Sequence, residues 1–281
     1  MMCRTVLYEE LSPRDFNERL KICPIAYLPL GTLEWHGEHL PLGADGIQAQ
    51  GFFIRLAQRM GGIVLPMLFL GPDEKQMVGD KTFFGMDIHS FEDGWAQQLA
   101  GSAYWIDDEL FLKVVETILI NLGRAGFKVV VAHGHGPSTE MMRVNTKRLE
   151  KTAGIRLANL WRRIEKDAFG FQIDHAAQNE TSLIMALRPE LEHLEEIAGS
   201  RIPIGIMGKD PRKSASVQLG DAIIAKNLER MESVLKKILA REQRPILPGS
   251  YRNARNLTVS RNIEMVIRKI EKKTGKTRIK L

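Results

Sequence analysis

The sequence has few cysteines and no long apolar run, and each shortage argues against a class of protein. Cys3 and Cys23 are the only two cysteines among 281 residues, so neither a disulfide framework nor a thiolate metal site is expected. No apolar run approaches the roughly 20 residues of a membrane-spanning helix. The stretch 1–13 carries charged residues such as Arg4 and Glu9 and lacks the apolar centre of a signal peptide. We therefore expect a soluble cytoplasmic protein with no membrane partner.

The net charge of +6 is concentrated near the C-terminal end of the sequence. Residues 241–281 contain twelve Lys or Arg against three Glu, a net charge of +9, so the other 240 residues carry a net −3. Nucleic-acid binding is one interpretation of this segment, but Tyr251 is its only aromatic residue. We favour a solvated basic helix at 260–273 or an oligomer contact. The predicted organisation is one domain over residues 1–245 and a basic helical extension over residues 246–281.

Strand-like and helix-like patterns alternate along the chain. Apolar runs typical of buried strands lie at 23–30, 63–70, 127–132 and 155–160. Helical patterns lie at 13–21, 46–60, 107–124, 138–151, in a segment ending at 187, and at 221–241. This alternation predicts an α/β fold in which three layers, α/β/α, are built on a mainly parallel sheet.

Residues 71–108 show no clear period and are rich in glycine and aromatic residues. A long irregular stretch in a compact domain is usually either functional or disordered, and the aromatic content argues against disorder. We interpret it as a partly ordered excursion over the functional site or into a subunit contact. Its polar residues Asp73, Glu74, Asp87 and His89 are interpreted as surface or lid residues and not as ligands.

The residue types that bind metals are most concentrated at 31–45, directly after the first predicted strand. Glu34 and His36 are two positions apart, so their side chains leave the same face of an extended segment. Asp45 follows where the loop ends and a helix is expected to begin. Carboxylate oxygen and imidazole nitrogen together suit divalent Zn, Mn or Fe. Because Asp45 also suits a helix N-cap, this loop alone leaves both a metal site and a capping role open.

Two further polar clusters lie between predicted elements. His133 and His135 follow the strand at 127–132, on one face if the chain stays extended, and His175 and Glu180 precede the helix that ends at 187. Sites in open parallel sheets form at the carboxyl ends of the strands. The three loops are therefore able to converge on one pocket.

These three segments together resemble the creatininase (creatinine amidohydrolase) family. The family's Glu-x-His-Gly-x-His-Leu-Pro stretch with a following Asp is matched by Glu34, His36, Gly37, His39, Leu40, Pro41 and Asp45. Its His-Ala-Gly-x-x-Glu-Thr-Ser stretch is matched by His175, Ala176, Glu180, Thr181 and Ser182. Its Asn-Gly-His-Gly-Gly-Asn stretch is altered around His135, because His133, Pro137 and Ser138 replace the first Asn, a Gly and the closing Asn.

The resemblance implies a hydrolase with two divalent metal ions per chain, Zn, Mn or Fe. By motif position, Glu34 and His135 bind one metal, His36 binds the other, and Asp45 bridges both. In creatininase itself a glutamate two residues after the histidine of the middle motif completes the second metal's ligands. That position is Pro137 here, which cannot bind a metal. The resemblance then favours Glu180 as the substitute ligand.

The implied reaction is attack of a metal-activated hydroxide on a carbonyl, which opens a cyclic amide or a similar C–N bond of a small molecule. His175 matches the family's catalytic histidine. Trp35 is interpreted as a wall of the substrate pocket. His133 is either an extra ligand, a substrate contact or a hydrogen-bonded filler.

Two alternative functions remain open, and the resemblance also implies an oligomeric state. The same site is able to hydrolyse a carbon–carbon bond in a cyclic ketone or sugar-derived diketone, because both reactions begin with attack on a carbonyl. A non-catalytic small-molecule binding protein on this scaffold is the alternative of another class. The resemblance also implies a homo-oligomer, a hexamer or a dimer.

Overall fold

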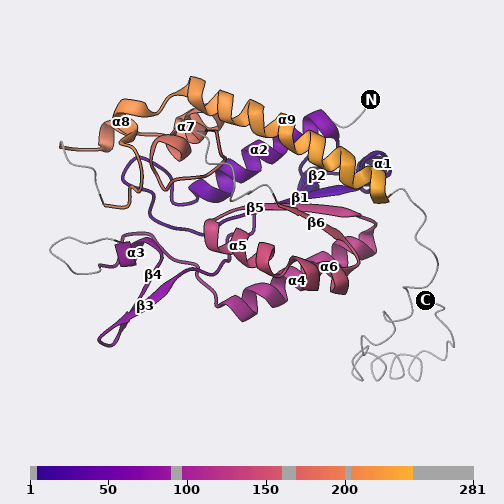
Figure 1. Cartoon of the computed structure of the whole chain (residues 1–281), viewed down its shortest axis with the longest axis horizontal. Helices are drawn as coiled ribbons and strands as arrows, with labels where there is room; N and C mark the ends of the chain where they lie inside the picture. The colour runs from indigo at the N-terminus through magenta and orange to yellow at the C-terminus, as the bar shows by residue number, and fades with distance from the viewer. Residues whose placement is uncertain (1–4, 90–96, 160–168, 200–203, 243–281) are drawn as a thin grey trace, which may run out of the picture. The chain divides into compact units, whose positions relative to one another are not determined.

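The computed structural model of the protein describes residues 5–89, 97–159, 169–199 and 204–242 (Figure 1). The chain divides into two compact units, Met1–Leu239 and Ala240–Leu281. The basic helix predicted at 260–273 lies outside the described residues. The fold and site below belong to the first unit.

A four-stranded parallel sheet with the order β2-β1-β5-β6 forms the centre of this unit. Its strands are β1 (Ile25–Leu30), β2 (Ile63–Val64), β5 (Val129–Gly134) and β6 (Arg156–Asn159). β1 pairs with β5 from Ile25 opposite Val129 to Leu30 opposite Gly134. Every residue of β1 and β5 is buried, as is typical of parallel strands covered on both faces. The predicted α/β class with a mainly parallel sheet is confirmed.

Helices cover both faces of the sheet, which makes three layers (Figure 1). One face is covered by α2 (Ala44–Met60), α7 (Gln178–Leu187) and α9 (Val217–Glu242). The other is covered by α1 (Pro13–Ile22), α4 (Asp108–Ala125), α5 (Gly136–Val144) and α6 (Thr146–Ala153). Alternate strand residues separate the two cores, because Tyr27 and Val131 face the first group while Leu28 and Val130 face the second. None of the helices in the described ranges has the length and hydrophobicity needed to span a membrane.

Two predicted elements differ from the structure for local reasons. The run at 63–70 is regular strand only at β2, because Pro66 has no N–H for a sheet ladder. The chain still follows β1 beyond this point, since the N–H of Leu68 donates to the carbonyl of Pro29 at 3.0 Å. The helix predicted at 138–151 is two helices, α5 and α6, which meet at Asn145.

The stretch 71–108 is more regular than predicted. β3 (Lys75–Val78) and β4 (Lys81–Phe84) form an antiparallel hairpin, followed by the short helix α3 (Met86–His89). The hairpin returns to the main body where the Phe84 ring stacks on Trp105 with centroids 6.0 Å apart. The remaining short elements are α8 (Pro211–Ser214) and the 3₁₀ turns η1 (Tyr8–Glu10), η2 (Pro189–Leu191) and η3 (Leu194–Glu196).

Candidate metal centre

Buried carboxylates and imidazoles gather at the carboxyl ends of β1 and β5. Glu34 and His36 lie in the loop after β1, Asp45 in the first turn of α2, His135 directly after β5, and Glu180 in the first turn of α7. None of these five residues is more than 5% exposed. The structure thus brings together the five residues that the motifs nominated as ligands.

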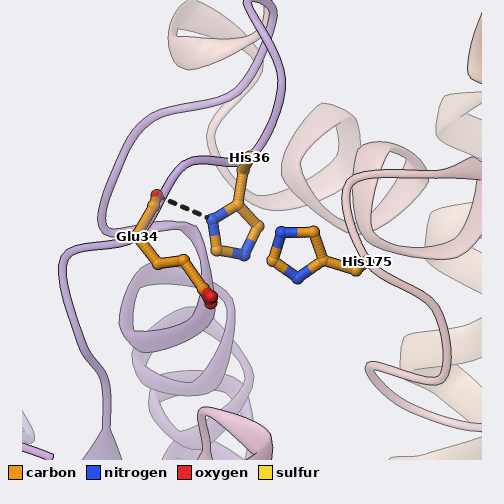
Figure 2. Close-up of side chains that lie close together, drawn as sticks. All are labelled: Glu34, His36 and His175. Atoms are coloured by element: carbon orange, nitrogen blue, oxygen red, sulfur yellow. Dashed lines mark hydrogen bonds between the residues drawn. The ribbon is translucent and has the colours of Figure 1, made fainter. Parts of the chain in front are cut away.

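His36 presents one ring nitrogen to two carboxylates. Its Nδ1 donates a hydrogen bond of 3.0 Å to the backbone carbonyl of Glu34, which leaves Nε2 for another partner (Figure 2). Nε2 lies 3.6 Å from Asp45 Oδ1 and 3.6 Å from Glu180 Oε2, and it has no hydrogen-bond partner among the described residues. These distances are too long for hydrogen bonds. Two atoms bound to one tetrahedral Zn²⁺ at about 2.1 Å are about 3.4 Å apart, so the spacing suits a shared cation.

His135 forms the centre of a second group. Its Nδ1 lies 2.9 Å from Asp45 Oδ2 and 3.6 Å from Glu34 Oε2. Asp45 therefore directs one carboxylate oxygen to His36 and the other to His135. A carboxylate in this position is able to bridge two cations.

The protonation equilibria reflect this crowding of charge. Burial raises the pKa of Glu34 to about 7, and the charge of His135 opposes this rise while that of Asp73 adds to it. Burial alone would lower the pKa of His36, but the carboxylates of Asp45 and Glu180 raise it to about 10. Burial also raises the pKa of Glu180 well above its ordinary value, and the charge of Asp45 adds to the shift. Buried carboxylates that repel one another are stabilised by cations, so the donor set fits two divalent ions.

Neighbouring groups hold two of these ligands in position. The side-chain amide of Gln172 donates to the backbone carbonyl of Asp45 at 3.0 Å and to its Oδ1 at 3.3 Å. The backbone N–H of Ala176 donates to Glu180 Oε2 at 2.8 Å. Such outer contacts fix the orientation of metal ligands.

His175 lies against the ligand group and stacks on His36, with ring centroids 4.2 Å apart and planes inclined by 28° (Figure 2). Its Nε2 donates to the backbone carbonyl of Trp35 at 2.8 Å, which leaves the lone pair on Nδ1. Burial, aided by the nearby charge of His36, lowers the pKa of His175 to about 3. The ring is therefore neutral near pH 7 and offers a proton acceptor beside the ligands.

A cavity of about 260 Å³ opens over this group, a size suited to a small molecule. Its lining includes His135, His175 and Glu180, together with the exposed Glu74 and His89. These two residues are at the surface, as predicted.

The structure does not bring Trp35 or His133 to the cavity lining. Trp35 points away from its neighbours Glu34 and His36, and its indole N–H donates to the carbonyl of Ile204 at 3.1 Å. The ring of His133 is buried against Phe171, with centroids 5.5 Å apart.

The extended course predicted through His133 and His135 is interrupted at Gly134. This residue has φ +146°, and a Cβ here would collide with the carbonyl of Leu30. The strand ends at Gly134, and the side chain of His135 lies beside Asp45 at the edge of the sheet.

The prediction that Asp73 and Asp87 lie at the surface is wrong, because both carboxylates are buried. The Asp73 side chain is 5% exposed, and its Oδ2 lies 3.1 Å from His135 Nε2. Asp87 is also buried, and its carboxylate accepts a hydrogen bond of 2.8 Å from the backbone N–H of Leu99. The sequence feature that could have indicated a site role for Asp73 is its place after the apolar run at 63–70. This run ends at the same sheet edge as the strands before Glu34 and His135.

Comparison with known proteins gives one family. The family model for creatininase (creatinine amidohydrolase) matches residues 9–226. Creatinine amidohydrolase of Pseudomonas putida is 25% identical over 218 residues, which cover 70% of this chain and 77% of that protein. The 3-dehydro-scyllo-inosose hydrolase of Thermotoga maritima is 22% identical over 202 residues, which cover 68% of this chain and 58% of that protein.

Solved structures of creatininases have the same fold. A creatininase in a Mn form superposes with a TM-score of 0.60 at 22% identity, covering 86% of this chain and all of that one. A mutant creatininase of the Zn–Zn type gives a TM-score of 0.61 at 22% identity, with the same coverage. At this level of identity the similarity shows the fold.

Proposed function

The chain belongs to the creatininase family, and from this premise we propose that it is a hydrolase with two divalent metal ions that opens a C–N bond in a small cyclic amide. The observation that carries the proposal is the position of Asp45, whose two carboxylate oxygens face two different histidines. The alternative role of Asp45 as a helix N-cap does not account for this arrangement. Gly43 is the N-cap residue of α2, and no side chain makes a capping hydrogen bond there.

Two subsites share Asp45 in this proposal. His36, Asp45 and Glu180 would hold one cation. Glu34, Asp45 and His135 would hold the other. Bound divalent cations lower the pKa of water from 15.7 towards ~7 and polarise a carbonyl oxygen. The Mn and Zn–Zn forms of related creatininases support Mn or Zn as the occupants, with Fe²⁺ as a further candidate for the same ligand types.

His175 moves the proton in this reaction. Its Nε2 keeps its proton, which it donates in a hydrogen bond to the carbonyl of Trp35. Nδ1 is therefore the atom that would accept a proton as water attacks the carbonyl carbon of the substrate. Burial lowers the pKa of His175, so a proton taken up by the ring would be released readily to the leaving nitrogen. The closed ring of the substrate then opens into a carboxylate and an amine.

Hydrolysis of a carbon–carbon bond in a cyclic ketone is the second candidate. It is favoured by the similarity to 3-dehydro-scyllo-inosose hydrolase, which nearly equals the similarity to creatinine amidohydrolase. A binding protein without catalysis is less consistent with the chain, because a centre that had lost its function would be expected to lose ligands first.

The experiment is metal analysis followed by a substrate panel. The purified protein is loaded with Zn²⁺ or Mn²⁺, its metals are counted by mass spectrometry, and it is incubated with cyclic amides and cyclic ketones. Ring-opened amines support the first candidate and ring-opened acids from ketones the second. A protein that binds no divalent cation refutes both.

We further propose that the chain forms a homo-oligomer, a dimer or a hexamer. The stretch 71–108 supports this, because its side chains Met77 and Tyr104 are 63% and 57% exposed. Light scattering at micromolar concentration tests the assembly, and a monomeric mass would contradict it.

A further inference from the structure

Asp73 approaches the candidate metal centre from a segment that contributes none of the other ligands. Its side chain is 5% exposed, which is unusual for a carboxylate. Its Oδ1 accepts a hydrogen bond of 2.7 Å from the backbone N–H of Glu74. Its Oδ2 lies 3.1 Å from His135 Nε2, and neither of these two atoms has another hydrogen-bond partner within the described ranges.

The two ring nitrogens of His135 have different surroundings. Nδ1 faces two carboxylates, those of Asp45 and Glu34, at 2.9 and 3.6 Å. Nε2 faces the carboxylate of Asp73. We place the cation at Nδ1, where the carboxylates of Asp45 and Glu34 converge. Glu34, Asp73 and His135 are also close enough together to hold an ion, and in that arrangement Asp73 would be a ligand. A neutral imidazole bound through Nδ1 must keep its proton on Nε2, where Asp73 is the carboxylate in reach.

Gly85 provides the space in which the carboxylates of Glu34 and Asp73 lie. It has φ +51°, and a Cβ at this position would overlap both Glu34 Oε1 and Asp73 Oδ2. The next residue, Met86, donates its backbone N–H to Glu34 Oε1 at 3.0 Å. The segment that carries Asp73 therefore also fits the carboxylate of a proposed ligand, independently of the contact with His135.

We propose that Asp73 is a positioning residue of the metal centre: it accepts the Nε2 proton of His135 and thereby keeps Nδ1 free to bind a cation. The inference rests on the proposed function, because it presupposes that His135 binds a metal. It assigns a role in the subsite formed by Glu34, Asp45 and His135 to the hairpin segment, by which we mean residues 73–89 with β3, β4 and α3.

The test compares cation binding by the wild-type chain, Asp73→Asn and Asp73→Ala. Glu74→Gln is the matched control, because Glu74 lines the same cavity but its side chain is exposed. Metal-free proteins are titrated with Mn²⁺ in a calorimeter, metals are counted at saturation, and thermal midpoints are measured without metal. We expect two sites in wild type and in Glu74→Gln. In both Asp73 variants one of the two sites should weaken by about 10–100-fold, with the other unchanged.

Each other result has a distinct meaning. Unchanged affinity at both sites in the Asp73 variants overturns the inference while leaving the proposed function intact. Binding of one cation at saturation also overturns it, because Asp73 would then be a ligand. A wild-type chain that binds no Mn²⁺ or Zn²⁺ refutes the proposed function instead. Asp73→Asn preserves the shape of the side chain, so it separates a weakened site from a misfolded variant if Asp73→Ala fails to fold.

Discussion

Replacement of Asp45 by alanine should remove both cations, whereas replacement of Glu34 should remove one. The difference follows from the contacts. Asp45 directs Oδ1 towards His36 and Oδ2 towards His135, at 3.6 and 2.9 Å, while the ion-pair contact of Glu34 Oε2 is with His135, at 3.6 Å. Both variants delete one buried carboxyl group, and they differ in the number of proposed subsites that this group serves.

The expected magnitude comes from the binding equilibrium. A cation present at 1,000 times its Kd adds about 4 kcal/mol to the free energy of unfolding when it binds the folded chain, so two cations bound in turn under this condition add about 8 kcal/mol. In a domain of this size each kcal/mol shifts the thermal midpoint by about 2–4 °C. Saturating metal should therefore raise the midpoint of wild type by about 16–32 °C, that of Glu34→Ala by about half as much, and that of Asp45→Ala by almost nothing.

The assay is differential scanning calorimetry of each protein with and without metal, combined with metal counts. The quantity compared is the rise on adding metal to the same variant, which cancels any effect of the mutation on the metal-free fold. Two cations per chain in Asp45→Ala, or equal rises in Asp45→Ala and Glu34→Ala, would refute the bridging position of Asp45.

Two further predictions concern the histidines. His175→Gln should keep both metals and the thermal midpoint while slowing turnover by about 10²–10⁴-fold, because the proton carrier is lost and the ligands remain. Steady-state rates measured together with metal counts test this prediction. Loss of metal in the variant would show that His175 is a ligand. Cation affinity should increase between pH 6 and pH 8. In the metal-free chain, burial lowers the pKa of His36, but the carboxylates of Asp45 and Glu180 outweigh it and raise this pKa to about 10. A proton must therefore leave Nε2 before a cation binds. Calorimetry in buffers of different ionisation enthalpy should detect the released proton, and affinity that does not change with pH would contradict the argument.

The fold was largely predictable because it depends on local patterns. Apolar runs marked the four strands, and the spacing of Glu34 and His36 indicated that both point the same way, as they do in the structure. The ends of elements were harder to predict, because they depend on single residues. Pro66 ends the regular part of β2, and Asn145 separates two helices that the sequence pattern joins.

The parts of the site that were missed depend on contacts between distant segments. The alternation that brings Glu34 and His36 inward turns Trp35 outward to Ile204, so a position between two ligands is the wrong place for a wall of the cavity. Asp73 belongs to no motif, and its position depends on the bridge between Gly71 and Trp105, which are far apart in the sequence. The place of Asp73 after the apolar run at 63–70 indicates the sheet edge, but the contact with His135 depends on the bridge between these two segments, which the sequence pattern does not give.

The segment that carries Asp73 differs in its packing from the segments that carry the other residues of the candidate metal centre. His36, Asp45 and Glu180 are attached to β1, α2 and α7, which pack in the core, whereas Asp73 is carried by a peripheral segment whose hairpin residue Met77 is 63% exposed. If a cation binds beside His135 as proposed, its affinity depends on the position of that segment, and by reciprocity its binding would stabilise this position. Since Glu74 and His89 of the same segment line the cavity, a cation in this proposed subsite would also hold part of the cavity wall in place. In the proposed centre, the cation beside His135 would therefore stabilise the cavity entrance in addition to its part in the reaction.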